Sequence, residues 1–65
     1  MKLNIYKIKC LMAELQMNQK NLGIKCDMNP NSLGVAFKKG VTSVVTAGKI
    51  AKALGTTVEE ITVKE

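Results

Sequence analysis

Apolar residues recur at helical spacing near the start of the chain. Between Asn4 and about Gln16, the apolar side chains of one series lie three, three, one and three positions apart. This spacing places them on one side of an α-helix, with the charged residues of the segment on the other side. We therefore expect a first helix here, with a buried face formed by Ile5, Ile8, Leu11, Met12 and Leu15.

A second, shorter helix is expected from its cap, Asn18, to about Lys25. Asparagine is a favoured N-cap because its side-chain oxygen accepts a hydrogen bond from a backbone N–H of the first turn. Leu22 would reach the core from this helix. Asp27 follows in the turn, and aspartate tolerates the left-handed backbone conformation better than most residues.

The third helix has a clear start and a clear end. Asn29 stands before Pro30, and proline suits the first helical position, where its missing N–H costs nothing. The helix is expected to run to Lys38 or Lys39 and to stop at Gly40. Its buried edge would be Leu33, Ala36 and Phe37. Together with the second helix and a turn of three or four residues, it predicts a helix-turn-helix.

The rest of the chain predicts two more helices. A fourth should run from about Val44 to Leu54 before Gly55, with an inward face formed by Val44, Ala47, Ile50, Ala51 and Leu54. Thr57, followed three positions later by Glu60, has the spacing of a capping box, which opens a short fifth helix. That helix should reach residue 61 or 62. The alternative for the last few of residues 56–63 is an extended backbone, because β-branched residues are dense there. The prediction is an all-α fold: a compact bundle of five short helices in one domain, residues 1–65.

The charge is concentrated in the part of the chain that contains the predicted helix-turn-helix. The net charge is +5: residues 1–40 hold seven lysines and two acidic residues, whereas residues 41–65 hold three of each. A basic half attracts phosphate or an anionic membrane surface. The chain has no arginine, which excludes the bidentate arginine–guanine contact. Two aromatic residues are too few for a base-stacking platform.

The two cysteines, Cys10 and Cys26, form no metal-ligand pattern, and the chain has no histidine. Both occupy positions where apolar residues are expected, so we interpret them as buried free thiols that act as small hydrophobes. The N-terminus lacks a continuous apolar signal segment, and no stretch approaches the ~20 residues of a membrane span. We expect a cytoplasmic protein without a metal, another cofactor, a membrane partner or an evident small-molecule ligand.

Taken in order, these segments resemble the Cro/repressor type (XRE-like) of helix-turn-helix domain found in phage, mobile-element and bacterial regulators. The segments that carry the resemblance are 17–19, 22–23, 29–33, 46–55 and 58–61. The resemblance covers about residues 4–62 and implies a lambda-repressor-like fold. Asp27 departs from it, because the family prefers glycine in the turn. Gly34 and Val35 stand where many members carry polar or basic side chains, and Gly34 also costs the helix roughly 1 kcal/mol relative to alanine.

The resemblance implies that the third helix, about residues 30–39, enters the major groove of double-stranded DNA. Base contacts would come from Pro30, Asn31 and Val35: asparagine can pair with adenine, and the two apolar side chains can contact thymine methyl groups. The alternative for Pro30 and Asn31 is a role in helix entry alone. The alternative for Val35 is packing under a neighbouring helix. Ser32 is expected to face partly inward.

Phosphate contacts are expected around the same helix. The resemblance gives Gln19 a phosphate contact and a bracing contact with the third helix, with a solvated surface side chain as the alternative. Asn29 is expected chiefly as a cap that also touches phosphate. The remaining candidates would act through ammonium, hydroxyl or backbone N–H groups, and they are Lys20, Lys38, Lys39, Thr42 and Ser43.

The function expected from this pattern is sequence-specific DNA binding by a transcriptional regulator, a phage or mobile-element repressor. The alternative is a protein-interaction module on the same fold, an anti-repressor or antitoxin-like partner. It is indicated by the apolar cluster of Val41, Val44 and Val45 and by Gly34 and Val35, which we expect to be exposed. An enzyme is not expected, because histidine, a paired-acid site and a glycine-rich phosphate loop are all missing. A monomer covers about one half-site of DNA, so the sequence leaves open whether the protein forms a homodimer. The candidate dimer surface includes Ile61 and Val63.

Overall fold

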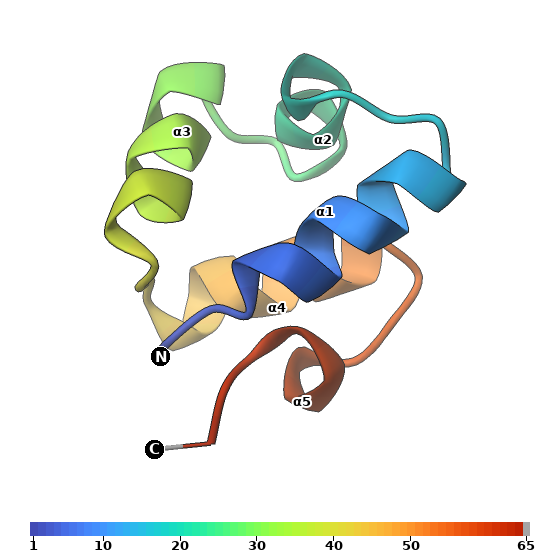
Figure 1. The fold of residues 1–65 in the computed structure, drawn as a ribbon. Helices are drawn as coiled ribbons and strands as arrows, with labels where there is room; N and C mark the ends of the chain where they lie inside the picture. The colour runs from blue at the N-terminus through green and yellow to red at the C-terminus, as the bar shows by residue number, and fades with distance from the viewer. Residues whose placement is uncertain (65) are drawn as a thin grey trace.

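The computed structural model describes residues 1–64, which form five α-helices in the predicted order (Figure 1). They are α1 (Ile5–Glu14), α2 (Gln19–Lys25), α3 (Pro30–Lys39), α4 (Val44–Ala53) and α5 (Val58–Ile61). The helices pack around a single core with a Cα radius of gyration of 10.2 Å. The prediction of a compact all-α bundle of five short helices is confirmed.

Polar side chains cap the start of each helix. At α2 the caps are reciprocal: the N–H of Asn21 donates to Asn18 Oδ1 at 2.8 Å, and the N–H of Asn18 donates to Asn21 Oδ1 at 3.3 Å. The other four caps are Asn4, Asn29, Ser43 and Thr57. Each satisfies a backbone donor that the first helical turn would otherwise leave unpaired. These local bonds explain why the helix starts could be predicted.

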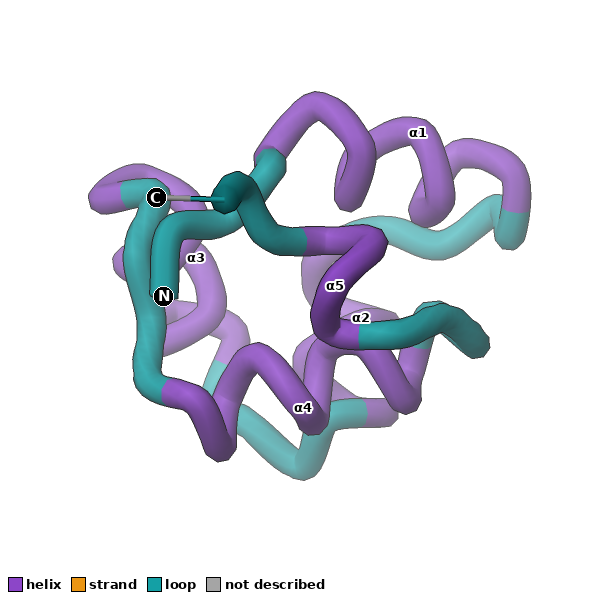
Figure 2. The backbone as a smooth tube through the Cα atoms, turned by 90° about the horizontal axis from the view of Figure 1, so that it is seen from below, coloured by secondary structure: helices purple, strands orange, loops and turns teal. Residues whose placement is uncertain are grey.

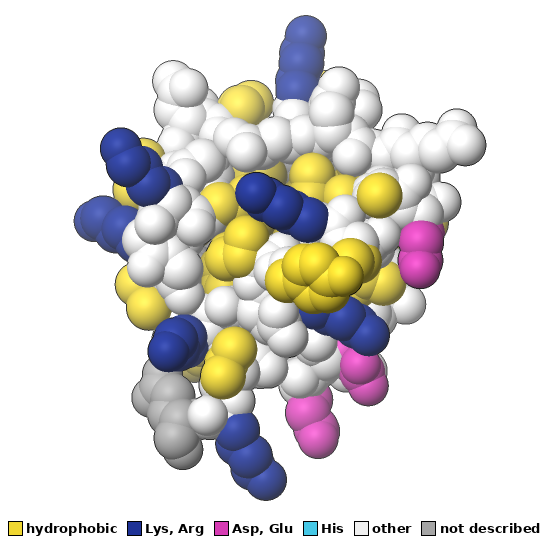
Figure 3. Space-filling model, in the orientation of Figure 1, with side chains coloured by type: hydrophobic (Ala, Val, Ile, Leu, Met, Phe, Trp, Pro, Cys, Tyr) yellow, Lys and Arg dark blue, Asp and Glu magenta, His cyan; other side chains and the backbone are white. Residues whose placement is uncertain are grey.

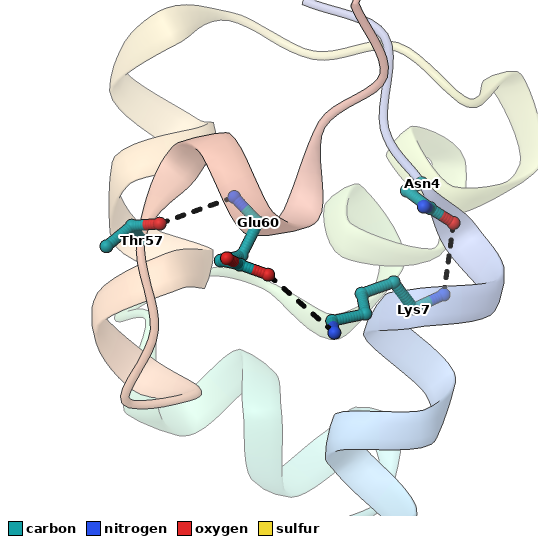
Figure 4. A network of polar contacts seen from close by, with 4 residues as sticks. All are labelled: Asn4, Lys7, Thr57 and Glu60. Carbon is teal, nitrogen blue, oxygen red and sulfur yellow. Dashed lines mark hydrogen bonds and ion pairs between the residues drawn. The ribbon is translucent and has the colours of Figure 1, made fainter.

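Only half of the capping box predicted at α5 is present. The N–H of Glu60 donates to Thr57 Oγ1 at 3.3 Å, as expected. The carboxylate of Glu60 instead lies 3.7 Å from the ammonium nitrogen of Lys7 on α1 (Figure 4). Both side chains are about half exposed, so water screens this ion pair and it stabilises the fold by at most about 1 kcal/mol. The contact joins α5 to α1 at the surface.

Three helices end in the same backbone motif. After α1, α2 and α4, one residue adopts a left-handed φ, and the residues are Gln16 (52°), Asp27 (56°) and Gly55 (69°). The N–H of the next residue then donates back into the helix, as Met28 does to the carbonyl of Gly23 at 2.8 Å. This is the Schellman pattern. The left-handed conformation predicted for Asp27 is confirmed, whereas the turn at Gln16 ends α1 two residues earlier than expected.

The core consists of apolar side chains from all five helices. Its completely buried large side chains are Ile8, Leu22, Leu33, Ile50 and Ile61. Two of the residues predicted for the buried faces are exposed instead: Leu15 by 50% and Val44 by 68%. Leu15 lies beyond the end of α1, so the helical phase no longer directs its side chain inward. Val44 shares the helical face of Ala47 and Ala51 but stands in the first turn of α4, at the end of the buried face.

Three expectations about single residues also differ from the structure. Cys10 is only partly buried, whereas Cys26 is buried as expected. Ile61 is completely buried, so it cannot belong to a dimer surface, while Val63 is 41% exposed. Leu54 is the C-cap of α4 rather than its last helical residue.

The extended N-terminal segment pairs with both the α3–α4 link and the C-terminal segment. Lys2 pairs with Val41, and Leu3 pairs with Thr62, in isolated antiparallel bridges. The N–H of Leu3 also donates to the carbonyl of Gly40 at 2.8 Å. Figure 2 shows these loops running side by side. The N-terminal segment therefore connects the end of α3 with the C-terminal segment, which helical periodicity did not predict.

Candidate nucleic-acid interface

The helices α2 and α3 form a helix-turn-helix with a four-residue connection, residues 26–29 (Figure 1). The close approach of the two elements occurs at Gly23, which is buried. A Cβ at Gly23 would lie 3.2 Å from the carbonyl oxygen of Met28 and 3.5 Å from the Cα of Pro30. A large side chain at this position would therefore push the start of α3 away from α2.

Gln19 connects the first turn of α2 to the first turn of α3. Its Nε2 donates to the carbonyl oxygen of Pro30 at 3.4 Å. The same amide covers Gly34, because a Cβ there would lie only 2.9 Å from Gln19 Nε2. Gly34 thus leaves the space that the Gln19 side chain occupies. The bracing contact expected of Gln19 is present, and it accounts for a glycine in the middle of α3.

The first turn of α3 is exposed and polar. Asn29 caps it, since its Oδ1 accepts the N–H of Asn31 at 2.8 Å. Pro30 and Asn31 are exposed, and within residues 1–64 no hydrogen bond engages the side-chain amide of Asn31. Ser32 is also exposed, contrary to expectation, because the helical phase directs Leu33 into the core instead. Ser32 is therefore a polar residue of the tip that sequence reasoning missed.

Val35 lies on the outer face of α3, where it is 51% exposed. The alternative that it packs under a neighbouring helix is therefore wrong. Residues four positions apart are neighbours on a helix surface, so Val35 lies one turn behind Asn31 on the same face. The pair presents an amide and a branched apolar group side by side.

The far end of α3 carries positive charge. Lys38 and Lys39 are both exposed in its last turn, and Lys20 is exposed on α2. In Figure 3, dark blue lysine side chains project beside α3 at the left, whereas the acidic side chains in view lie at the right and lower edges. Phosphate groups approaching α3 on this side would therefore meet cations.

The two hydroxyl residues after α3 already have structural contacts. The backbone N–H of Thr42 donates to the carbonyl of Met1 at 2.9 Å, so it is engaged within the protein. The hydroxyl of Ser43 accepts the N–H of Thr46 at 3.2 Å and donates to Thr46 Oγ1 at 3.0 Å. Both residues stabilise the link to α4. The exposed lysines are thus better placed than these two residues to meet phosphate.

Cys26 lies behind the helix-turn-helix as a buried thiol. Its Sγ donates to the carbonyl oxygen of Lys49 at 3.7 Å. Burial raises the pKa of this thiol above its ordinary value of 9.0, and the nearby charge of Lys49 offsets part of the increase. Across residues 1–64, no three His, Cys, Asp or Glu side chains come together as a metal site. In the same part of the chain, no helix has the length and apolar character needed to cross a bilayer.

In comparisons with protein-family models, with curated proteins and with solved structures, nothing matches this chain. The fold and the site define a small all-α domain in which a braced helix-turn-helix presents an exposed polar tip.

Proposed function

We propose that this protein is a sequence-specific DNA-binding transcriptional regulator of the Cro/repressor type, with α3 entering the major groove. The observation that carries the proposal is the tip of α3. The amide of Asn31 is exposed, and the helix that presents it is held by the Asn29 cap and by the bond from Gln19 to Pro30. A rigid helix with a side-chain amide at its start suits the reading of base edges.

Each part of this surface has a distinct role in the proposed complex. Asn31 pairs with the N6 and N7 groups of an adenine, while Pro30 and Val35 contact thymine methyl groups. Gln19 uses one hydrogen of its amide to brace Pro30, and its second hydrogen can donate to a phosphate oxygen. Lys20, Lys38 and Lys39 neutralise neighbouring phosphates without reading sequence.

The regulator acts by occupying an operator and therefore works in the cytoplasm, where the DNA lies. One domain of this size covers about one half-site, so we propose that a second copy binds a half-site about 34 Å away. Val63 remains available for contact between the copies, since it is 41% exposed.

The test is a binding-site selection with the purified chain, followed by fluorescence anisotropy on the selected duplex and on random DNA. We expect Asn31→Ala to lower the affinity for the selected duplex by roughly 5- to 150-fold, the equivalent of ~1–3 kcal/mol, and to leave binding to random DNA unchanged. Lys38→Gln should weaken binding to both duplexes and reduce the salt slope by about 0.9.

Lys9→Gln is the matched control, because Lys9 is an exposed lysine on α1, away from the helix-turn-helix. This variant should retain both the affinity and the salt slope. Equal affinity of the unmodified chain for selected and random DNA would overturn the proposal.

A second candidate function is binding of a protein partner, which rests on three exposed valines. Val41, Val44 and Val45 are 49%, 68% and 69% exposed within five positions of the chain. A stoichiometric partner whose binding is lost in Val44→Ser and Val45→Ser, but kept in Asn31→Ala, would favour this function. The two functions are thereby separated by residues on different elements.

A further inference from the structure

A surface formed by the ends of α1, α2 and α4 contains two neighbouring hollows. The first, of about 320 Å³, is lined by Lys25, Cys26, Lys49, Lys52 and Ala53. The second, of about 370 Å³, is lined by Leu15, Gln16, Met17, Asn21, Ile24 and Lys25. Lys25 lines both hollows, so the two lie side by side, and we call them together the Lys25 surface. No residue of α3 lines either hollow.

The first hollow is cationic. Lys49 and Lys52 lie one turn apart on α4, and Lys25 lies in the last turn of α2. All three are exposed, and among residues 1–64 no carboxylate lines the hollow. The closest acidic residue along the chain is Asp27, which is outside the lining. Three ammonium groups around one hollow repel each other, so an anionic occupant would be attracted.

The second hollow is flanked by apolar side chains that the core does not use. Leu15 is 50% exposed and Ile24 is 67% exposed, while Met17 is half-buried between them and the core. The exposure of Leu15 follows from the left-handed turn at Gln16, which ends α1 before Leu15 can continue its buried face. Apolar groups of this kind beside a hollow favour contact with another apolar group.

We propose that the Lys25 surface binds an acidic amphipathic segment of a partner protein. Apolar side chains of the segment cover Leu15 and Ile24, and its carboxylates face Lys25, Lys49 and Lys52. Charge complementarity favours this occupant over a second copy of the chain, whose net charge of +5 would be repelled. A phosphate-bearing ligand would use the lysines but would leave the two apolar side chains exposed. This binding is independent of DNA binding by α3.

The experiment uses the full chain labelled with ¹⁵N and a synthetic helical peptide. The peptide has leucines at positions i, i+3, i+4 and i+7 and glutamates on its other face; a second peptide has glutamines in place of the glutamates. We expect the acidic peptide to shift the amide signals of Ile24, Lys25, Lys49 and Lys52 and to bind at least about tenfold more tightly than the glutamine peptide.

Two pairs of variants separate the contributions of charge and apolar contact. Replacing Lys25, Lys49 and Lys52 by glutamine should weaken binding at least about tenfold, whereas the same replacement at Lys2, Lys9 and Lys64 changes the net charge equally and should have little effect. Ile24→Ser should also weaken binding. Tyr6→Ser is its control, because Tyr6 is an apolar side chain that is 80% exposed on α1 and lines neither hollow.

Inorganic phosphate and a random DNA duplex serve as competing probes. Equal binding of the two peptides would overturn the proposal, as would peptide-induced shifts confined to α3. If phosphate alone reproduces the shifts at the three lysines and Ile24→Ser has no effect, the surface is a simple anion site and the proposal is wrong. A chain that fails to select DNA can still bind the peptide, so this result is separable from the proposed function.

Discussion

At the scale of single residues, Cys26 shows how burial changes the chemistry of a side chain. The thiol is 3% exposed, and its sulfur donates to the backbone of α4 rather than to solvent. Burial raises the pKa of this thiol because the low-dielectric surroundings penalise the thiolate. A thiol of this kind is a packing residue, not a reactive one.

We predict that Cys26 makes the stability of the fold depend on pH in the alkaline range. The unfolded thiol ionises at about 9.0, and the folded thiol ionises at higher pH. Its contribution to stability is therefore complete below pH 9 and is lost as the pH rises through the folded pKa. Urea unfolding between pH 7 and 10 should show this decline, and Cys26→Ala should reduce it.

Cys10→Ala serves as the comparison. This variant leaves the buried thiol of Cys26 in place, so it should show the full decline of stability above pH 9. The idea fails if Cys26→Ala and the unmodified chain lose stability in parallel above pH 9.

Ser32 and Leu15 show where sequence reasoning about single residues failed. Ser32 was expected to face partly inward, yet Leu33 alone takes the buried position in that turn. Leu15 was assigned to a buried face whose helix ends one residue before it. The error at Leu15 comes from extending an ideal helical phase beyond the end of α1, whereas Ser32 lies inside α3, where the helical phase directs Leu33 into the core.

At the scale of the elements, the contact between α2 and α3 decides how the tip of α3 is presented. Gln19 holds the carbonyl of Pro30, and Gly34 provides the space for its amide. In the sequence, Gly34 was only a departure from the family pattern and a cost to helix stability. Its packing role depends on a residue fifteen positions earlier, so no local pattern could reveal it.

Gly34→Ala and Gly48→Ala form a matched pair that tests this contact. Both glycines are inside helices, so alanine should add up to about 1 kcal/mol of helix stability at each position. Among residues 1–64, a Cβ at Gly48 meets nothing within 4 Å, whereas one at Gly34 displaces the amide of Gln19. We expect Gly48→Ala to raise the urea midpoint and to leave DNA affinity unchanged.

Gly34→Ala should gain less stability and should lower the affinity for the selected duplex several-fold, because the brace to Pro30 is lost. Anisotropy and urea unfolding measure the two effects separately. Identical DNA affinities for the two variants would show that the contact between Gln19 and Pro30 has no role in binding.

At the scale of the whole molecule, the N-terminal segment joins regions that are far apart in the sequence. Leu3 is 4% exposed, and its N–H donates to the carbonyl of Gly40 at 2.8 Å. The next N–H, that of Asn4, donates to the carbonyl of Ile61 at 2.8 Å. The N-terminal segment thus joins the end of α3 to the end of α5.

Leu3→Ala should therefore destabilise the fold by about 2–4 kcal/mol, since it removes a buried side chain at the junction of these segments. Val41→Ala is a suitable comparison, because Val41 is 49% exposed and its truncation should cost much less. Urea unfolding at pH 7 measures both. Equal losses of unfolding free energy in the two variants would show that the junction adds no stability beyond ordinary surface packing.

The tertiary structure also divides the positive charge differently from the sequence. Counting along the chain placed the excess on residues 1–40, with the second part neutral. In the fold, Lys49 and Lys52 lie beside Lys25, so a second cationic region forms away from α3. We infer from this that two surfaces, rather than one, attract anionic partners.

Local signals in the sequence predict the five helices and three of their caps, Asn18, Asn29 and Thr57. The start and end of α3, at Pro30 and Lys39, follow from the Asn29 cap and the glycine stop, because such signals act within one helical turn. Tertiary contacts alone show that Gly34 leaves space for Gln19, that Val35 is exposed, and that the N-terminal segment pairs with the α3–α4 link and with the C-terminal segment. These features depend on contacts between residues far apart in the sequence, which helical periodicity and capping do not encode.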